Sequence, residues 1–401
     1  MLTFPSRCAT LIGLALLVSL ASGSVPAELP AVGKAGAPPR TLNAQESTAW
    51  LAGRRLFDRR WTEDHGLGAP GFNAESCASC HNAPALGGAG ANEHNVIRFR
   101  GDSGYDPNRM FTVGSCGFSR PPESFDIQAT MRKFRDRRAN KSGISSLEEI
   151  QTPSLFGLGL IATIPDAEIL KREDPSDRDG DGVRGVARRL EVNVAEEIGR
   201  FGWKAQTPRL SDFVCMALAG EVGVTAPEQG RGFGLAKDSD SVSDPEISDA
   251  DFEHLNFYVE NLAAPRRASG ASYQAQVGER LFAAVGCTAC HVPTLEGSEG
   301  PVPLYSDLLL HEIVETNEAQ EKASRVRRSR RRDDRKPEPS GFRTAPLWGV
   351  GSTAPYLHDG SAATLREAVL GHGKEALSSR EEFERLETID QEALLAFLKS
   401  L

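Results

Sequence analysis

The chain has 401 residues, of which 39% are hydrophobic and 25% charged, with a formal net charge of −9. This ordinary globular composition excludes a fully disordered, a collagenous or a multi-span membrane protein, and the acidic balance argues against a general nucleic-acid binder. The length suffices for about two domains with hydrophobic cores of their own. Seven cysteines are too few for a disulfide scaffold, so their spacing is more informative than their number.

The N-terminal segment has the pattern of a secretory signal peptide. One positive charge at Arg7 precedes the apolar run 9–20, and small residues follow at 21–24. The run is too short to span a bilayer, and no cysteine directly follows it that could take a lipid. We predict a signal peptide at residues 1–23, a flexible linker at 24–40, and a periplasmic or secreted protein without a membrane anchor. A buried N-terminal helix is the alternative.

Two segments carry the pattern C-x-x-C-H, at residues 77–81 and 287–291. Cysteines spaced in this way can both form thioethers with the vinyl groups of one haem, and the adjacent histidine then binds the iron. Zinc would need four ligands around one ion, and a redox dithiol or a disulfide would leave each histidine without a role. Two covalently attached haems c are therefore predicted. The predicted attachment residues are Cys77, Cys80, His81, Cys287, Cys290 and His291.

The chain repeats itself around these motifs. GRRLF at residues 53–57 precedes the first motif and GERLF at 278–282 precedes the second, while the similar segments 251–262 and 390–401 follow them. The two later segments have apolar residues at i, i+3, i+4 and i+7, which is typical of one face of an amphipathic helix. We predict an all-α fold with two cytochrome c-type haem domains and long loop insertions. The N-terminal domain would comprise residues 41–265 and the C-terminal domain 266–401, with a linker at 263–271.

Several further stretches resemble the bacterial di-haem oxidoreductases, a group of peroxidase-like and "thiol oxidoreductase-like" proteins. The resemblance runs from about residue 45 to the C-terminus and implies a distant relationship to di-haem cytochrome c peroxidases and to di-haem enzymes that oxidise protein tryptophans. It implies that peroxide reacts at the N-terminal haem and that the C-terminal haem takes in or stores electrons. The stretches are GFNAESC (71–77), TPSLFGLGL (152–160), GRFGWKA (199–205), PLYSDLLLH (303–311), FRTAPLW (342–348) and APYLHDG (354–360).

The same resemblance implies residues that complete the C-terminal haem site. The peroxidases have a methionine as the second axial ligand, and His372 stands at that position here. This predicts ligation by His291 and His372 and a comparatively low reduction potential, because imidazole replaces a thioether. Arg343 resembles an arginine that pairs with a haem propionate, and His358 is expected in the haem wall as a hydrogen-bonding residue. The alternatives are a solvated loop histidine at 372 and a plain surface arginine at 343.

The N-terminal haem site is less well defined by the resemblance. Trp203 resembles the tryptophan that lies between the haems of the peroxidases and could carry electrons, with an ordinary core side chain as the alternative. The relatives also place a glutamine and a glutamate over the peroxidatic iron. Phe213 departs from the glutamine, and Glu221 reaches the glutamate position only across a two-residue gap. We predict Glu221 as the acid–base group that assists O–O cleavage, with a surface carboxylate as the alternative.

Other histidines and methionines have weaker support as ligands. His94 lies in a glycine-rich loop and could bind the first iron reversibly, but an exposed loop residue is expected there. For the remaining candidates, proximity in sequence is the only argument. These are His65, Met110, Met131 and Met216.

One acidic segment has the D-x-D-x-D-G pattern of a calcium loop, because Asp177, Asp179 and Asp181 alternate before Gly182. Position twelve is Arg188 instead of the bidentate glutamate of an EF-hand. The peroxidase relatives bind calcium between their domains. A candidate calcium loop and a solvated Asp/Gly turn therefore stay as alternatives.

Three other features leave alternatives open. Cys116 and Cys215 could form a disulfide in an exported protein or remain buried thiols. The arginine-rich segment 325–336 is expected to be a disordered insert, with a docking patch for an acidic partner as the alternative. The acidic run 238–251 is interpreted in the same way.

The sequence thus predicts an exported di-haem c oxidoreductase, a peroxidase that reduces hydrogen peroxide at the N-terminal haem. Electrons from a small periplasmic donor, such as a cytochrome c, would reach it through the C-terminal haem. One alternative is an electron-transfer di-haem cytochrome c without turnover of its own, and another is a di-haem enzyme that oxidises a protein partner. Thiol oxidation has no support at the level of residues.

Overall fold

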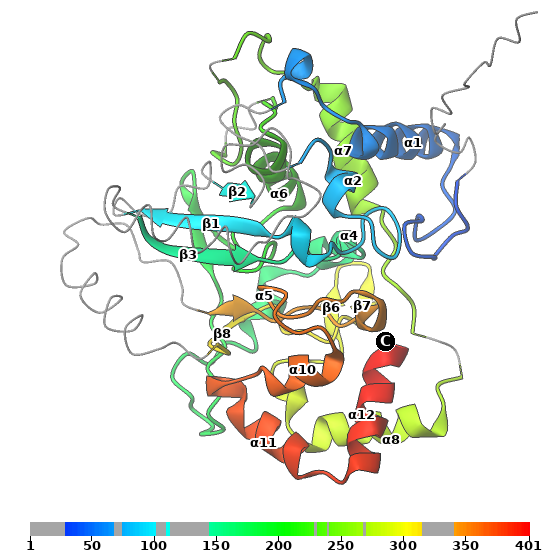
Figure 1. The fold of residues 1–401 in the computed structure, drawn as a ribbon, viewed down its shortest axis with the longest axis vertical. Coiled ribbons are helices and arrows are strands. Elements are labelled where there is room, and N and C mark those ends of the chain that lie inside the picture. Colours follow the sequence, from blue (N-terminus) through cyan, green and yellow to red (C-terminus); the bar gives the residue numbers. More distant parts are fainter. Residues whose placement is uncertain are drawn as a thin grey trace, which may run out of the picture.

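The computed structural model describes residues 29–67, 74–101, 110–112, 144–227, 231–238, 240–267, 270–314 and 341–401. The predicted signal peptide, Cys116, Met131 and the arginine-rich segment 325–336 lie outside the described residues. Figure 1 shows an N-terminal unit with helices α1 and α7 in the upper part of the molecule and a C-terminal unit with helices α8 and α12 at the bottom. The predicted boundary at residues 265 and 266 falls in the connection between α7 and α8.

Two long helices frame the N-terminal unit, α1 (Ala44–Asp58) and α7 (Asp249–Glu260). A capping box begins α1, in which the side chain of Asn43 and the side chain of Glu46 each accept a hydrogen bond from the other residue's amide. The two helices cross at Gly53, where a Cβ atom would lie 1.9 Å from the carbonyl oxygen of His254. Only glycine permits so close an approach of two helix backbones.

The C-terminal unit repeats this crossing with α8 (Tyr273–Ala284) and α12 (Thr388–Ser400). A Cβ atom at Gly278 would lie 1.9 Å from the carbonyl oxygen of Ala393. Gly53 and Gly278 are the first residues of the repeated GRRLF and GERLF sequences. The sequence repeat is therefore also a repeat of helix packing, and the predicted closing helices are present as α7 and α12.

Shorter helices fill the space between these pairs. The α-helices are α2 (Cys77–Cys80), α4 (Leu158–Ala162), α5 (Asp166–Leu170), α6 (Leu210–Ala217), α10 (Leu365–Leu370) and α11 (Leu377–Arg385). The 3₁₀ segments are η1 (Glu63–His65), η2 (Asn92–His94), η5 (Cys287–Ala289), η6 (Val350–Ser352) and η7 (Lys374–Ala376), and η4 (Leu218–Val222) is a π-helix that continues α6. Among the described residues, none of the helices combines the length and apolar character needed to cross a bilayer.

The fold also contains short antiparallel sheets, so the prediction of an all-α fold is wrong in this respect. The strands pair in the orders β2-β1-β3, β4-β5, β6-β7 and β8-β9. The β4–β5 hairpin turns at Asn193, which has a φ of 57°, and its strands are too short and too acidic to give a clear alternating pattern. The strands are β1 (Val96–Gly101), β2 (Met110–Thr112), β3 (Ile144–Ile150), β4 (Arg189–Val192), β5 (Ala195–Ile198), β6 (Leu295–Gly297), β7 (Gly300–Val302), β8 (Leu310–His311) and β9 (Phe342–Arg343).

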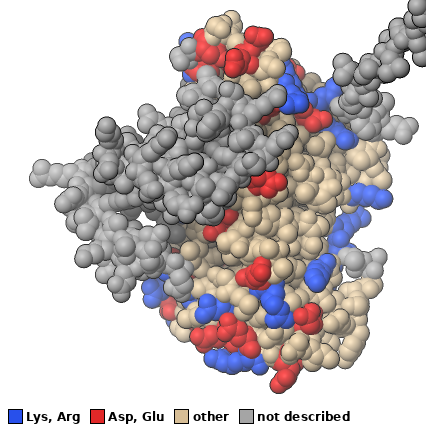
Figure 2. All heavy atoms as spheres, in the orientation of Figure 1, with Lys and Arg blue, Asp and Glu red and all other residues tan. Residues whose placement is uncertain are grey.

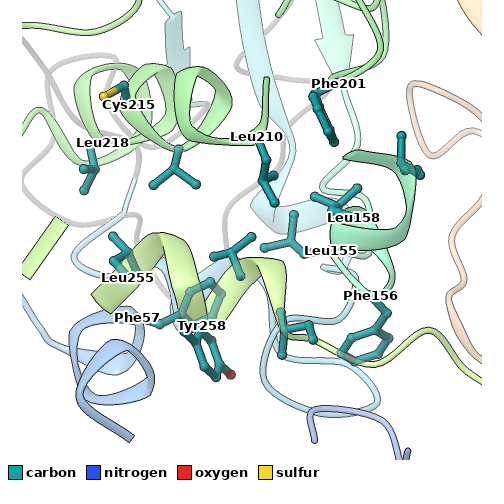
Figure 3. Close-up of a cluster of buried hydrophobic side chains, with 14 of the residues drawn as sticks. Phe57, Leu155, Phe156, Leu158, Phe201, Leu210, Cys215, Leu218, Leu255 and Tyr258 are labelled. Atoms are coloured by element: carbon teal, nitrogen blue, oxygen red, sulfur yellow. The ribbon is translucent and has the colours of Figure 1, made fainter. Parts of the chain in front are cut away.

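The larger hydrophobic core belongs mainly to the N-terminal unit. Figure 3 shows Phe57 of α1 against Tyr258 of α7, and their ring centroids are 5.2 Å apart. The same cluster includes Leu295 and Leu308 of the C-terminal unit, so the two units share buried apolar surface. A separate cluster around Phe282 and Phe397 fills the space between α8 and α12.

Residues 29–40, predicted as part of a flexible linker, form turns that pack against the N-terminal unit instead. Ala37 is fully buried, and its carbonyl oxygen accepts a hydrogen bond of 2.8 Å from the amide of Ala263. The small side chains in this stretch give no apolar periodicity, yet they fit closely beside Ala85 and Leu86. Small residues can therefore pack without the pattern that a sequence-based prediction uses.

Candidate functional site

The first C-x-x-C-H motif opens into a cavity of about 130 Å³. Helix α2 places both cysteines on one turn, after an N-cap at Ser76 whose side chain accepts a hydrogen bond from the amide of Ser79. Cys77, Cys80 and His81 all line this cavity. The opposite wall comes from α6 and the π-helix η4, and the closing helix α7 completes it.

His81 is held as an iron ligand would be. Its Nδ1 atom lies 3.1 Å from the carbonyl oxygen of Gly88, and Phe57 packs beside the ring with centroids 6.3 Å apart. A carbonyl accepts only from a protonated nitrogen, so in the neutral ring that makes this bond to Gly88, Nε2 is the unprotonated nitrogen. Burial lowers the pKa of His81 to about 4, which keeps the ring neutral at physiological pH. The carbonyl thus fixes the tautomer that can donate Nε2 to a metal.

The second motif repeats this arrangement at a cavity of about 270 Å³. The Nδ1 atom of His291 lies 2.9 Å from the carbonyl oxygen of Tyr305, and Phe282 packs beside the ring at 6.2 Å. Burial lowers the pKa of His291 to about 4. Cys287, Cys290 and His291 all line the cavity. Both units therefore present two cysteines and one neutral histidine to an apolar space.

The surroundings of the motif cysteines argue against a redox dithiol at both motifs. All four motif cysteines are free thiols. Burial raises the pKa of Cys77, Cys80 and Cys287 to about 12, whereas a reactive dithiol needs a lowered thiol pKa. Among the described residues, the groups of side chains that could hold a metal ion contain carboxylates alone, which gives no support to a zinc site at either motif.

His372 faces the second cavity together with His291. It follows α10, and its Nδ1 atom lies 2.7 Å from the carbonyl oxygen of Ala368. Burial lowers the pKa of His372, which favours the neutral ring, and the contact of Nδ1 with a carbonyl leaves Nε2 as the unprotonated nitrogen of that ring. The structure thus places in one cavity the two histidines that the resemblance implies as axial ligands.

Arg343 is buried beside the same cavity. Its Nε atom donates to the carbonyl oxygen of Gly202 at 3.0 Å and its Nη1 atom to that of Thr344 at 3.4 Å. Burial lowers the pKa of Arg343 to about 10, partly opposed by the charge of Asp307. A guanidinium that is bonded to carbonyl oxygens offers its positive charge to an anionic group in the cavity, such as a haem propionate.

Trp203 lies in the wall between the two cavities and lines both. Its indole Nε1 atom donates to the carbonyl oxygen of Gln151 at 2.8 Å, and its own carbonyl oxygen accepts from the amide of Arg343 at 2.7 Å. These bonds fix the ring from both units. The residues that line both cavities are Gln151, Pro153, Leu155, Gly202, Trp203 and Phe213.

Glu221 lies on the π-helix η4 and lines the first cavity. It is half-buried, and its charge raises the pKa of Cys77 and Cys80. It is therefore placed beside the first haem motif and is not a remote surface carboxylate. Phe213, at the expected glutamine position, lines the shared wall.

Met216, a candidate that only its proximity in sequence supported, lines the first cavity. Its spacing from Phe213 is the i, i+3 signal of a common helix face and could have identified it.

The remaining histidine predictions have different outcomes. His358 lines the second cavity and stacks on Phe342, with ring centroids 3.9 Å apart. His94 is half-buried, contrary to the expected exposed loop residue, and its charge lowers the pKa of His81. Its buried Nδ1 atom has no hydrogen-bond partner among the described residues. His65 is exposed and lies 2.8 Å from the hydroxyl of Thr62.

A buried charged cluster beside the second cavity was not predicted. His311 of β8 lies with Nε2 2.8 Å from an oxygen of Asp307 and with Nδ1 3.0 Å from an oxygen of Glu375. Burial alone would lower the pKa of His311, but hydrogen bonds to Asp307, Cys290 and Glu375 outweigh it and raise the pKa to about 12. The imidazole is therefore a cation between two carboxylates. His311 lies in the PLYSDLLLH stretch, but its partner Glu375 is distant in sequence and gave no signal.

Two carboxylate groups have the geometry of metal sites. The ligand atoms of Asp177, Asp179 and Asp181 lie within 4.8 Å of one another, as do those of a second group in the acidic run 238–251. The side chain of Asp177 also accepts a hydrogen bond from the amide of Gly182, which is typical of an Asp/Gly turn. Calcium at this loop stays a prediction. The second group consists of Asp238, Asp240 and Glu246.

The residues at both cavities fit haem groups, with paired thiols, a neutral histidine of the correct tautomer and, at the second cavity, a buried arginine. Two such cavities with a common wall define a di-haem redox protein. Residues 147–401 match the family model described as "Di-haem oxidoreductase, putative peroxidase". The match spans more than half of the chain, and the protein belongs to this family of di-haem oxidoreductases, which confirms the resemblance in its sequence.

Other comparisons give weaker similarities. No curated protein sequence matches the chain. The hydrazine synthase of Kuenenia stuttgartiensis is similar with 16% identity and a TM-score of 0.37 over 100% of both chains. A MauG-like protein associated with microbial copper homeostasis is similar with 15% identity and a TM-score of 0.39 over 94% of both chains. The family assignment rests on the family model.

Proposed function

We propose that this di-haem oxidoreductase is an exported peroxidase that reduces hydrogen peroxide at the first cavity with electrons relayed through the second. The observation that carries the proposal is the asymmetry of the two cavities. Glu221 faces the first and a second histidine, His372, faces the other, with Trp203 in the wall between them. Haem c, attached through Cys77 and Cys80 and through Cys287 and Cys290, would supply the iron chemistry in each cavity.

At the first cavity, Glu221 would move the proton of the peroxide. Moving a proton from one oxygen of hydrogen peroxide to the oxygen that leaves needs an acid–base group beside the reacting atoms, and a carboxylate can serve as one. Glu221 is half-buried on the cavity wall, where such a group can hold a proton away from bulk water. The apolar rings of Phe213 and Phe57 line the same space and limit the access of water.

At the second cavity, the side chains would hold an electron-transfer site. His291 and His372 would together hold the iron through two imidazoles, which would favour a low reduction potential. Arg343 would offset the charge of a propionate. A site of this kind exchanges electrons with little change in ligation, which suits a relay and not a peroxide-binding iron.

Trp203 would provide the path between the two cavities. Its hydrogen bond to Gln151 and the bond from Arg343 to its carbonyl oxygen keep the indole in the common wall. Fixed positions favour electron transfer because little reorganisation is needed. The electron donor would be a small periplasmic protein such as a cytochrome c. Figure 2 shows acidic and basic side chains interspersed on the lower part of the visible face, over the C-terminal helices.

Stopped-flow spectroscopy of the purified holoprotein tests the proposal. The fully oxidised and the partly reduced forms are each mixed with one equivalent of hydrogen peroxide, and the haem spectra are followed. Rapid loss of stored electrons from the partly reduced form is expected. Spectra that do not change in either form would overturn the proposal.

Met216 favours a second candidate function, an electron-transfer cytochrome. Its side chain lines the first cavity, and a thioether is a common axial ligand in cytochromes c. Ligation by His81 and Met216 in every redox state would close the first iron to peroxide. A Met216→Leu variant that gains peroxide reactivity which the wild type lacks would establish this second function.

A further inference from the structure

The mostly buried carboxylate of Glu375 helps to hold the loop that carries His372. One oxygen of Glu375 lies 3.0 Å from Nδ1 of His311 and accepts a hydrogen bond of 2.8 Å from the amide of Arg184. The other oxygen accepts a hydrogen bond of 2.9 Å from the amide of Glu312. The Glu375 side chain is 13% exposed. Three donors, two of them on the adjacent residues His311 and Glu312, therefore meet at a single carboxylate that is mostly buried.

The hydrogen bonds continue from Glu375 to the second haem motif. On the far side of His311, Nε2 lies 2.8 Å from a carboxylate oxygen of Asp307. The amide of Asp307 donates to the carbonyl oxygen of Cys290 at 3.0 Å. A chain of contacts thus runs from the motif that carries His291, through two buried charged residues, to the loop that carries His372. We call Asp307, His311 and Glu375 the clasp.

The clasp also contacts the N-terminal unit. Arg184, which donates its amide to Glu375, follows directly on Val183, a residue that lines the second cavity. Two positions further on, Val186 and Leu310 exchange backbone hydrogen bonds of 3.1 and 2.9 Å, next to His311. The same carboxylate therefore joins the His372 loop to both units.

We propose that Glu375 is a positioning residue that keeps His372 in place over the second cavity and couples that position to the interface between the two units. The inference rests on the proposed binding of the second iron by His372. Loss of the carboxylate charge would remove the charge-assisted contact with His311, weaken the bonds from the two backbone amides, and leave Asp307 as the remaining clasp partner of His311. The loop would keep the bonds from Gly373 to Ile313 and from Arg380 to the His372 carbonyl, of 2.9 and 3.2 Å. We therefore expect a loosened ligand and not an unfolded loop.

The test uses the full-length holoprotein with both haems and compares Glu375→Gln, Glu375→Asp and a control. Glutamine keeps the size of the side chain but removes the charge, and aspartate keeps the charge but shortens the reach. Glu382→Gln is the matched control, because Glu382 is exposed on the neighbouring helix α11 and pairs with Arg385 at 2.5 Å. The readouts are the spin state of the oxidised C-terminal haem, carbon monoxide binding to its reduced form, and the thermal unfolding midpoint.

In Glu375→Gln we expect a mixture of low-spin and high-spin C-terminal haem and about tenfold more carbon monoxide binding there, because one lost charge-assisted hydrogen bond shifts an equilibrium by about that factor. Glu375→Asp should lie between wild type and Glu375→Gln, and Glu382→Gln should match wild type. A folded Glu375→Gln holoprotein with wild-type spin state and carbon monoxide binding would overturn the positioning role, even if its unfolding midpoint had fallen.

His372→Ala separates this inference from the proposed ligation. If His372→Ala becomes high-spin while Glu375→Gln stays wild-type, the positioning role alone fails. If His372→Ala has the wild-type spectrum, the ligand assignment fails and the positioning role fails with it. Should Glu375→Gln not yield holoprotein, Glu375→Asp decides by the same measurements, and wild-type carbon monoxide binding in that variant overturns the inference.

Discussion

In the N-terminal unit Phe57 packs beside His81, whose Nδ1 atom faces the Gly88 carbonyl oxygen. The C-terminal unit has Phe282 beside His291 in the same way. This likeness ends on the opposite walls of the cavities. A π-helix with a glutamate faces the first motif, whereas a loop with a second histidine faces the other. The crossed helices and the motif therefore form the side of each site that the two units share. The segments between the helices form the opposite walls and make the two sites chemically different.

The largest effect is expected from removing the second histidine. If His372 binds the iron as proposed, His372→Ala should convert the C-terminal haem completely from low-spin to high-spin, because one imidazole would then remain in the cavity instead of two. Electron paramagnetic resonance of the oxidised holoprotein measures the change. His65→Ala, which alters an exposed histidine, should leave the spectrum as in wild type. An unchanged spectrum in His372→Ala would remove the main chemical difference between the two units.

The glutamate of the first cavity gives the next effect. Glu221→Gln should slow peroxide consumption by about 10²-fold, the usual contribution of a positioned acid–base group. The spectrum of the C-terminal haem should not change, since Glu221 lines the first cavity. Glu196→Gln, on the exposed part of β5, serves as the control. A wild-type rate of peroxide consumption in Glu221→Gln would contradict the role assigned to this residue.

The helix crossings can be tested separately in each unit. Gly53→Ala and Gly278→Ala should each lower the free energy of unfolding by about 2 kcal/mol, because the added methyl group forces two helix backbones apart. Denaturant unfolding measures both variants. The exposed Arg55→Ala on α1 should stay within about 0.5 kcal/mol of wild type. Wild-type stability of either glycine variant would show that the crossing tolerates a side chain.

A smaller effect concerns stability alone and should leave both haem sites untouched. Two nitrogens of Arg189 donate to Glu173, and this contact holds the pKa of the Glu173 carboxyl below its usual range despite partial burial. A lowered folded pKa gives stability that is present above the unfolded pKa of about 4.3 and is lost as pH falls through the lower folded value. Glu173→Gln should cost about 1 kcal/mol at pH 7 and less as the pH falls. The same cost at pH 7 and pH 3 would contradict the pairing.

Local patterns in the sequence were sufficient to predict the side of each site that both units share, which consists of the C-x-x-C-H motif and the crossed helices. The spacing of the motif cysteines and the glycines at 53 and 278 are signals within a few residues, and the helix pairs follow from them. Resemblance to a family pointed to Trp203, Glu221 and His372, and the structure places all three on the walls of the two cavities. The inserted segments were harder to predict, because their contacts are distant in sequence. Glu375 meets Arg184 and His311 only in the folded chain, and the packed turns at 29–40 have no periodicity to detect.

The central claim is that one iron is open and the other is closed by two histidines, and carbon monoxide tests it most directly. The fully reduced holoprotein is titrated with carbon monoxide, and the amount bound per chain is measured together with the haem that binds it. We predict one carbon monoxide per chain, at the N-terminal haem. Binding at both haems would contradict ligation by His372, and binding at neither would contradict an open peroxide site.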